Sequence, residues 1–215
     1  MKEPSTPVVS AAPHGAKARA TFESLLGAGE RLLASQGPAS LTSTAVAAEA
    51  GVATGTFYTY FADKDALLAA LFARRLDELA GVVDAELSAE ALLDRGLRGA
   101  LDGAVEAVVA GYRAHSAVIR AALGRVPDSP VLRDVYWARH ATVLDGARRF
   151  IERGARAGLV RDGDSRSLAQ ALLVVVQGLN HPVVLAGRPA EVRAVAAHVA
   201  EALHGMLSPL RAGDA

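Results

Sequence analysis

The segment from Val52 to Asp63, VATGTFYTYFAD, combines hydroxyl side chains with aromatic rings at the spacing of one short helix. Phe57 and Phe61 are four residues apart, so on a helix both rings face the same way, toward a core. The hydroxyl-bearing residues fall mostly on the other faces; they are Thr54, Thr56, Tyr58 and Thr59. Such a helix suits insertion into the major groove of DNA. An ordinary amphipathic helix with two core phenylalanines would show the same pattern.

The residues before this segment predict two helices that position it. Apolar side chains repeat at helical spacing over residues 17–36, and Gly37-Pro38 then forms a helix stop. A second helix is expected over residues 41–50, with Thr42 placed to cap its first turn. Gly51 breaks this helix, and the hydroxyl-bearing segment then supplies a short third helix. The order is that of a helix-turn-helix arrangement.

Asp63 and Lys64 follow the segment, where a fourth helix is expected to begin. The Asp63 carboxylate suits the capping position and the positive end of the helix dipole. Lys64 lies in the same first turn, where that dipole disfavours a cation. An external phosphate would account for a lysine there, and a solvated lysine with a small energetic cost would account for it equally well.

Taken together, these features resemble the DNA-binding domain of the TetR family of transcriptional regulators. The resemblance covers about residues 17–79 and rests on Gly37, on residues 42–52 ending in EAGV, on GTFYTYF and on DKDAL. It implies an all-α fold and contact with double-stranded DNA. The candidate DNA-binding residues are Thr42, Ser43, Thr54, Gly55, Thr56, Tyr58, Thr59, Tyr60 and Lys64.

The resemblance also assigns roles within this set. Thr42, Tyr58 and Lys64 are expected to contact phosphates, residues 54–56 to face the groove, and Tyr60 to lie near the DNA backbone.

Three positions depart from the family pattern. A serine often caps the third helix where this chain has Ala53, so Thr54 is expected to take over the cap. A basic residue is frequent at Thr54, and an apolar one at Ser43. Each missing phosphate contact lowers the slope of the logarithm of the DNA-binding constant against the logarithm of the salt concentration, the log–log salt slope, by about 0.9. We therefore expect modest non-specific affinity and a shallow salt dependence.

Composition limits the alternatives. The 215 residues carry 23 basic and 23 acidic side chains, so there is no global basic field to attract nucleic acid. There is no cysteine, which excludes a disulfide framework and a cysteine-zinc site. No signal-like segment is visible at the start, and we expect a cytoplasmic protein without a cofactor or metal.

The expected organisation has three parts. Residues 1–15 are rich in proline and predict a disordered arm. Residues 16–80 form the DNA-binding domain, with the helix-turn-helix at 42–61. Residues 81–210 form a larger helical domain, which brings the total to about nine helices without a strand.

One stretch of the second domain, residues 167–187, contains no charged side chain. A membrane span is rejected because polar residues and Pro182 interrupt the stretch. A charge-free helix in a soluble chain is expected to be buried on several sides. The resemblance implies that the last two helices form a four-helix bundle with a second subunit. His181-Pro182 is expected to kink the helix or end it early.

The resemblance further implies that the second domain binds a small, usually apolar inducer. Each candidate taken singly is more often a core or surface residue, and sequence does not choose among them. We expect a hydrophobic ligand with one or two hydrogen-bonding points. The candidate ligand-binding residues are Tyr112, His115, Arg120, Trp137, His140, Gln177, Asn180 and His181.

Catalysis finds no support. The sequence has no phosphate-binding glycine loop and no serine elbow. The most tempting base, His140, lies five residues from Asp145, which puts the two on poorly matched helix faces. We therefore expect a homodimeric repressor released from a palindromic operator by a ligand. The alternative is the same fold without specific DNA binding, acting as a small-molecule or protein-binding dimer.

Overall fold

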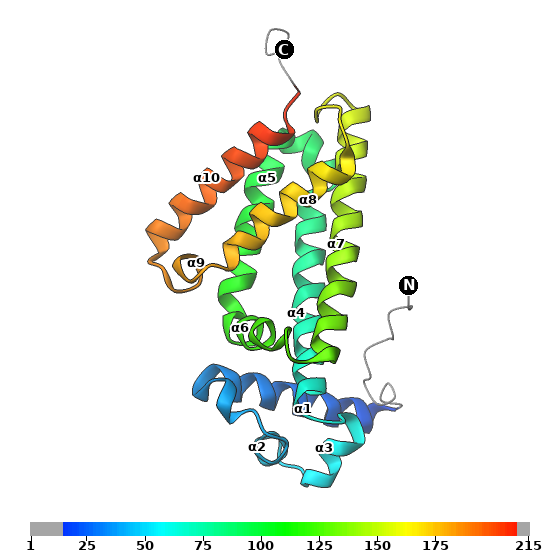
Figure 1. Cartoon of the computed structure of the whole chain (residues 1–215), viewed down its shortest axis with the longest axis vertical. Helices are drawn as coiled ribbons and strands as arrows, with labels where there is room; N and C mark the ends of the chain where they lie inside the picture. Colours follow the sequence, from blue (N-terminus) through cyan, green and yellow to red (C-terminus); the bar gives the residue numbers. More distant parts are fainter. Residues whose placement is uncertain (1–14, 210–215) are drawn as a thin grey trace. The chain divides into compact units, whose positions relative to one another are not determined.

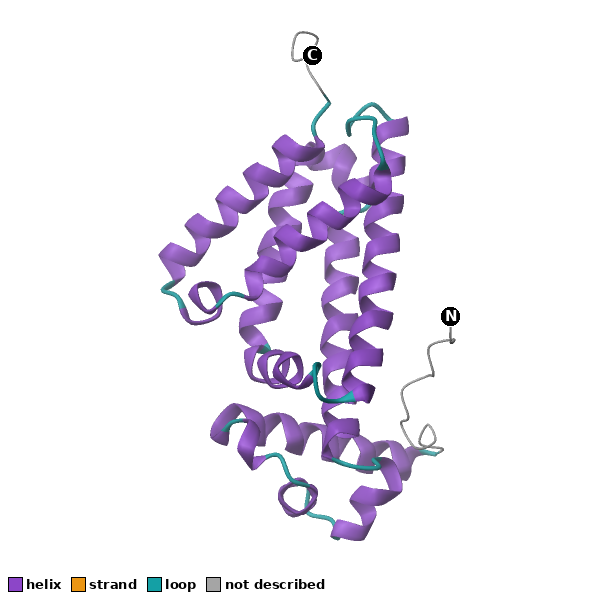
Figure 2. Ribbon diagram, viewed as in Figure 1, coloured by secondary structure: helices purple, strands orange, loops and turns teal. Residues whose placement is uncertain are grey.

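The computed structural model describes residues 15–209, and within that range the protein consists of helices and loops (Figures 1 and 2). There are ten α-helices, nine of them at least seven residues long, and two short 3-10 helices. The all-α class is therefore confirmed. The arm predicted for residues 1–15 lies outside the described residues, except for Gly15.

The described helices pack in two units. One, the head unit, comprises residues up to 76 together with 115–139, and the second unit comprises 77–114 and 140 onward. Each unit has its own apolar core. The domain boundary predicted after residue 80 stays a prediction, because packing units and sequence domains are different divisions of a chain.

The head unit contains the helices on which the predicted DNA-binding residues lie. They are α1 (Ala16–Gln36), η1 (Pro38–Ser40), α2 (Ser43–Glu49), α3 (Thr54–Tyr60), the start of α4 (Lys64–Glu86), α6 (Ser116–Arg125) and the start of α7 (Pro130–Arg156). Phe57 and Phe61 are 0% exposed, and the Phe61 ring stacks on Phe22 with centroids 5.3 Å apart. The two phenylalanines thus anchor α3 to the core shared with α1 and α4.

The turn between α2 and α3 is a Schellman motif. Gly51 adopts a φ of 71°, the left-handed conformation that glycine tolerates best. The Gly51 N–H donates to the Ala48 carbonyl at 3.1 Å, and the Val52 N–H donates to the Ala47 carbonyl at 2.9 Å. These bonds satisfy the last carbonyls of α2 and turn the chain into α3.

Ion pairs tie α1 to its neighbours in the head unit. Arg74 of α4 binds both oxygens of Glu23 at 2.7 Å, and Arg31 Nε lies 2.7 Å from Glu49 Oε1 in α2. The hydrogen bond from Arg74 is the main reason why the pKa of Glu23 lies below its usual value.

The second unit contains the rest of α4 and α7 together with four further α-helices and one 3-10 helix. These are α5 (Ala89–Ala114), α8 (Ser165–Gln177), η2 (Gly178–Asn180), α9 (Pro182–Ala186) and α10 (Pro189–Leu207). Helix α5 packs along α10 and is interrupted at Gly96, whose φ is 66°. The apolar spacing of residues 88–114 is that of one continuous helix and gives no sign of this kink.

The charge-free stretch is divided among α8, η2 and α9. Helix α8 ends at Gln177, and Pro182 occupies the first turn of α9, so the early end predicted from His181-Pro182 is confirmed. Leu172 and Leu173 face the core, whereas Val174 is 70% exposed. Within one chain, the stretch is therefore buried on one side only.

Candidate nucleic-acid interface

Helix α3 separates an apolar anchor from a polar outer surface. Phe57 is fully buried, while Tyr58 is 54% exposed and Gly55 and Thr59 are exposed as well. Thr54 and Thr56 are half-buried. This is the division expected from the helical spacing of the aromatic and hydroxyl residues.

Ser43, at the start of α2, contacts α3 through Tyr58. The Ser43 Oγ and the Tyr58 hydroxyl are 2.9 Å apart. Ser43 is half-buried, so an apolar side chain could occupy its place but could not form this bond. The departure from the family pattern at Ser43 thus has a structural use.

The predicted cap of α2 is confirmed. The Thr42 hydroxyl oxygen accepts from the Ala45 N–H at 3.1 Å. Because this bond uses the oxygen as acceptor, the hydroxyl proton is still available to donate to a phosphate. Thr42 is exposed, as a phosphate contact requires.

The predicted cap of α3 is wrong. The helix begins at Thr54, and Ala53 occupies the N-cap position with no side-chain cap. Thr54 already has helical geometry and cannot serve as the N-cap one residue later. The Ala53 carbonyl accepts from the Thr56 N–H at 2.8 Å, which closes the first turn without a side chain.

Two further residues of the set make local contacts. Thr59 Oγ1 donates to the Gly55 carbonyl at 3.4 Å, a weak bond within one helical turn. The Tyr60 ring is half-buried against Phe22, with centroids 6.1 Å apart. Tyr60 therefore presents only part of its ring to solvent.

Helix α4 begins with a capped turn that includes Lys64. The Ala66 N–H donates to Asp63 Oδ1 at 2.8 Å, so the predicted cap is confirmed. Lys64 is exposed, and no ion pair involves it within residues 15–209. Its ammonium group is therefore available to an external anion.

The predicted ligand-binding residues of the head unit have other contacts. His115 Nδ1 lies 3.3 Å from Glu30 Oε1, and Glu30 also accepts from Arg75. Arg120 is exposed and donates to a carbonyl of its own helix. Trp137 is 57% exposed. None of these three shares a unit with the other five candidates.

In the second unit, the structure brings together two of the remaining candidates. Gln177 Nε2 lies 3.2 Å from His140 Nδ1. The Asn180 Oδ1 is buried without a hydrogen-bond partner, and His181 Nδ1 accepts from the Val183 N–H at 3.3 Å. Tyr112 packs at the edge of the core of this unit. Their role in binding a ligand stays a prediction.

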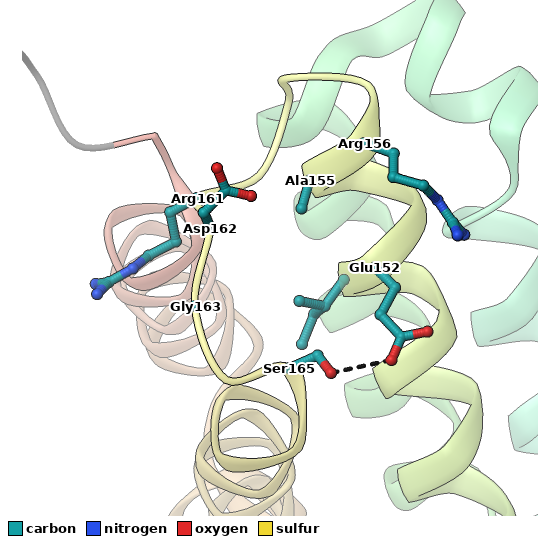
Figure 3. Close-up of a pocket in the computed structure, with 8 residues that line it drawn as sticks. Glu152, Ala155, Arg156, Arg161, Asp162, Gly163 and Ser165 are labelled. Atoms are coloured by element: carbon teal, nitrogen blue, oxygen red, sulfur yellow. Dashed lines mark hydrogen bonds between the residues drawn. The ribbon is translucent and has the colours of Figure 1, made fainter.

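The second unit also has a pocket, lined by both charged and apolar residues, that the sequence did not indicate. Its volume is about 240 Å³. Figure 3 shows both acidic and basic residues in its lining. Ser165 Oγ donates to Glu152 Oε1 at 3.0 Å across it. The lining residues are Ile151, Glu152, Ala155, Arg156, Arg161, Asp162, Gly163 and Ser165. None of the predicted ligand-binding residues is among them, and the lining does not match an apolar inducer.

The acid–base pair considered from the sequence does not form. Asp145 accepts from Arg148 at 2.9 Å and pairs with Arg149, and the hydrogen bond from Arg148 chiefly keeps the pKa of Asp145 below its usual value. His140 instead contacts Gln177. Among the described residues, no cluster of His, Asp and Glu side chains is placed to hold a metal ion, and no helix could cross a membrane.

Comparisons with known proteins agree with this geometry. Residues 25–71, which run from α1 through the first turns of α4, match the sequence profile of bacterial regulatory proteins of the tetR family. A search of curated protein sequences gives no match.

Solved structures show the same fold across most of the chain. A TetR transcription regulator from Haloarcula marismortui ATCC 43049 is 20% identical, with a TM-score of 0.72 over 87% of this chain and 98% of that one. The fatty acid degradation regulator FadR from Bacillus halodurans is 18% identical, with a TM-score of 0.70 over 86% and 95%. A protein from Saccharomonospora viridis, solved in complex with choline, is 21% identical, with a TM-score of 0.70 over 87% and 97%.

Proposed function

We propose that the chain is a homodimeric transcriptional repressor, since residues 25–71 match the tetR family of bacterial regulatory proteins. It binds a palindromic operator and releases it when a small hydrophobic ligand binds the second half of the chain. The observation that carries this proposal is the exposed hydroxyl surface of α3, anchored by the fully buried Phe57 and Phe61 and followed by the exposed Lys64.

In this proposal, a few placed contacts hold the DNA. Thr42, Tyr58 and Lys64 donate to phosphates, and residues 54–56 and 59 present small groups to base edges in the major groove. Ser43 holds Tyr58, and Tyr60 lies near the backbone. Because Arg31 of α1 and Arg74 and Arg75 of α4 each pair with a glutamate, these three cations add little positive field around α3. The individual hydrogen bonds and contacts of α3 then have to supply most of the affinity for DNA.

Two copies of α3 must reach successive major grooves, about 34 Å apart, if the operator is a palindrome. The exposed side of α8 supports a second copy as the partner, because Val174 and Val175 are solvent-exposed on a helix without charged residues after Arg166. Burying these valines against a symmetry-related helix would remove apolar surface from water. Helix α10 completes the proposed four-helix interface.

Ligand binding acts by a population shift. The ligand favours a dimer shape in which the two α3 helices no longer match the groove spacing. Operator affinity falls by an amount set by the difference between the ligand's affinities for the two dimer shapes. The choline complex of the Saccharomonospora viridis protein supports small-molecule binding by this fold. His140 and Gln177 supply the hydrogen-bonding point that a mainly hydrophobic ligand needs.

Substitution of two phosphate-contacting residues tests the proposal. Tyr58→Phe and Lys64→Ala are each expected to weaken binding to all duplexes, specific and non-specific, as lost phosphate contacts should. Arg153→Ala serves as the charge-matched control, because Arg153 is exposed in the second unit. If both variants bind a selected duplex like the wild type, the contacts are wrongly assigned.

The alternative is a dimer of the same fold that does not bind specific DNA and takes a small molecule or a protein partner. Three features favour this alternative: α3 has no side-chain cap at Ala53, residue 54 is a threonine where a basic residue is frequent, and the net charge is zero. It predicts that the wild type enriches no sequence and that Tyr58→Phe and Lys64→Ala change nothing.

A further inference from the structure

Asp65, the residue after Lys64, accepts a hydrogen bond from the turn between α6 and α7. Arg125, the last residue of α6, places its Nη2 2.6 Å from Asp65 Oδ2. Ser129, directly before α7, also helps to lower the pKa of this carboxylate. All three residues belong to the head unit, although 60 positions separate Asp65 from Arg125.

The turn that provides this donor is itself closed. The Ser129 N–H donates to the Arg125 carbonyl at 2.9 Å, and the Ser129 carbonyl accepts from the Arg133 N–H at 3.0 Å to start α7. Ser129 is 2% exposed, so the turn is buried on this side. The turn and the first turn of α4 are thus held together by one acidic side chain.

The charges of this cluster are largely shielded from solvent on the Asp65 side. The Asp65 side chain is 16% exposed and that of Arg125 is 43% exposed. Burial alone would raise the pKa of Asp65, but the hydrogen bond and charge of Arg125, helped by Ser129, outweigh it, and the pKa lies below the usual 3.8. The carboxylate is therefore ionised and neutralised by Arg125 at neutral pH.

The negative charge of Asp65 lies next to Lys64 in the sequence and would affect its ammonium group. An unpaired carboxylate one residue from Lys64 would attract the lysine ammonium and repel a DNA phosphate. With Arg125 bound, the carboxylate instead fixes the backbone of the turn that carries Lys64.

We propose that Asp65 is a positioning residue, which holds Lys64 in place for its phosphate through the ion pair with Arg125. The turn between α6 and α7 then sets the strength of a DNA contact made by α4. This inference rests on the proposed function, because it presupposes that Lys64 binds a phosphate.

The salt dependence of DNA binding separates positioning from mere stability. The probe is a duplex of about 40 base pairs selected with the wild-type protein, long enough for two half-sites. Asp65→Asn keeps the side-chain shape and adds one positive charge to each protomer. It is expected to weaken binding several-fold and to lower the log–log salt slope by about 0.9 per protomer, because the Lys64 contact is lost. Simple electrostatics predicts the opposite, tighter binding.

Matched variants sharpen the comparison. Arg125→Gln is expected to lower the salt slope as Asp65→Asn does. Arg125→Lys keeps the positive charge and is expected to lower the slope less than Arg125→Gln. Arg74→Gln is the control, because it also removes one cation and breaks an ion pair of α4, the pair with Glu23. It should leave the slope unchanged. In a Lys64→Ala background, Asp65→Asn should cause no further loss of slope.

The outcomes are distinguishable. If Asp65→Asn keeps the wild-type salt slope and binds DNA as tightly as the wild type or more tightly, the positioning role is overturned. The proposed function would remain intact. No binding of any duplex by the wild type would overturn both. Circular dichroism and thermal melting confirm that each variant is folded, and if Asp65→Asn does not fold, Arg125→Gln against Arg74→Gln decides the question.

Discussion

The Tyr58 hydroxyl lies 2.9 Å from Ser43 Oγ, so a side-chain hydrogen bond joins α3 to the first residue of α2. Tyr58 is otherwise 54% exposed, and a long exposed side chain loses rotamer freedom when it binds. The bond with Ser43 restricts the ring, which in the proposed function would prepare it for a DNA phosphate. It also keeps the Tyr58 hydroxyl next to the helix start that Thr42 caps.

This bond gives the first prediction. Ser43→Ala should weaken DNA binding several-fold, about 0.5–1.5 kcal/mol, because the tyrosine is no longer held. The effect should vanish in a Tyr58→Phe background. Equilibrium binding of the two single variants and the double variant to one duplex measures the coupling. Additive losses would mean that the bond does not position Tyr58.

Truncation of the α3 anchor should unfold the head unit more easily. Phe57→Ala removes a fully buried ring and is expected to cost about 3–5 kcal/mol of unfolding free energy. Thr59→Ala, on the exposed side of the same helix, should stay within about 0.5 kcal/mol. Urea denaturation of both variants at equal protein concentration provides the comparison. Equal losses would contradict the assigned faces of α3.

Two glycines of the helix-turn-helix should respond in opposite directions. Gly51→Ala forces a side chain into the left-handed conformation and should cost about 1–2 kcal/mol. Gly55 lies within α3, and a Cβ there meets no atom within 4 Å, so Gly55→Ala should stabilise the helix by up to about 1 kcal/mol. Thermal melting tests both changes. A DNA-binding assay of the more stable Gly55→Ala then shows whether a methyl group is tolerated at the groove.

The Asp65 ion pair predicts a pH-dependent contribution to stability. The folded-state pKa of Asp65 is lowered, so its contribution is fully present above the usual value of 3.8 and is lost as the pH falls through the folded pKa. The cost of Asp65→Asn in unfolding free energy should therefore be full near pH 7 and shrink toward about pH 3. Urea denaturation at several pH values measures it. A cost that is independent of pH would show that the charge of Asp65 does not contribute.

The exposed valines of α8 predict a dimer interface that a single charged substitution should disrupt. Val174→Glu places a carboxylate in the proposed apolar interface and should give a monomer by light scattering. Leu93→Glu is the control, because Leu93 is 85% exposed on α5 and lies outside the proposed interface. A wild-type monomer, or a Val174→Glu dimer, would contradict the interface.

The features predicted correctly from the sequence are those that depend on neighbours along the chain. The Thr42 and Asp63 caps, the buried Phe57 and the break at His181-Pro182 each follow from residues within about one turn. Local spacing suffices for these.

The features that were missed depend on partners far away in the sequence or on backbone alternatives. The Asp65–Arg125 pair spans 60 positions, and nothing near Asp65 indicates that an arginine will come to it. Gly96 lies within a continuous helical pattern, so the kink leaves no sign in the spacing. The cap assigned to Thr54 failed because the first turn of α3 closes on the Ala53 carbonyl instead.

The most direct test of the central claim is selection of duplexes from a random-sequence pool by the purified full chain at low salt. The proposal predicts enrichment of a palindrome whose half-sites are about one helical turn apart or a multiple of it, as two α3 helices of a dimer require. A folded, dimeric protein that enriches no sequence, in buffer or with cell extract to supply any corepressor, would contradict the claim.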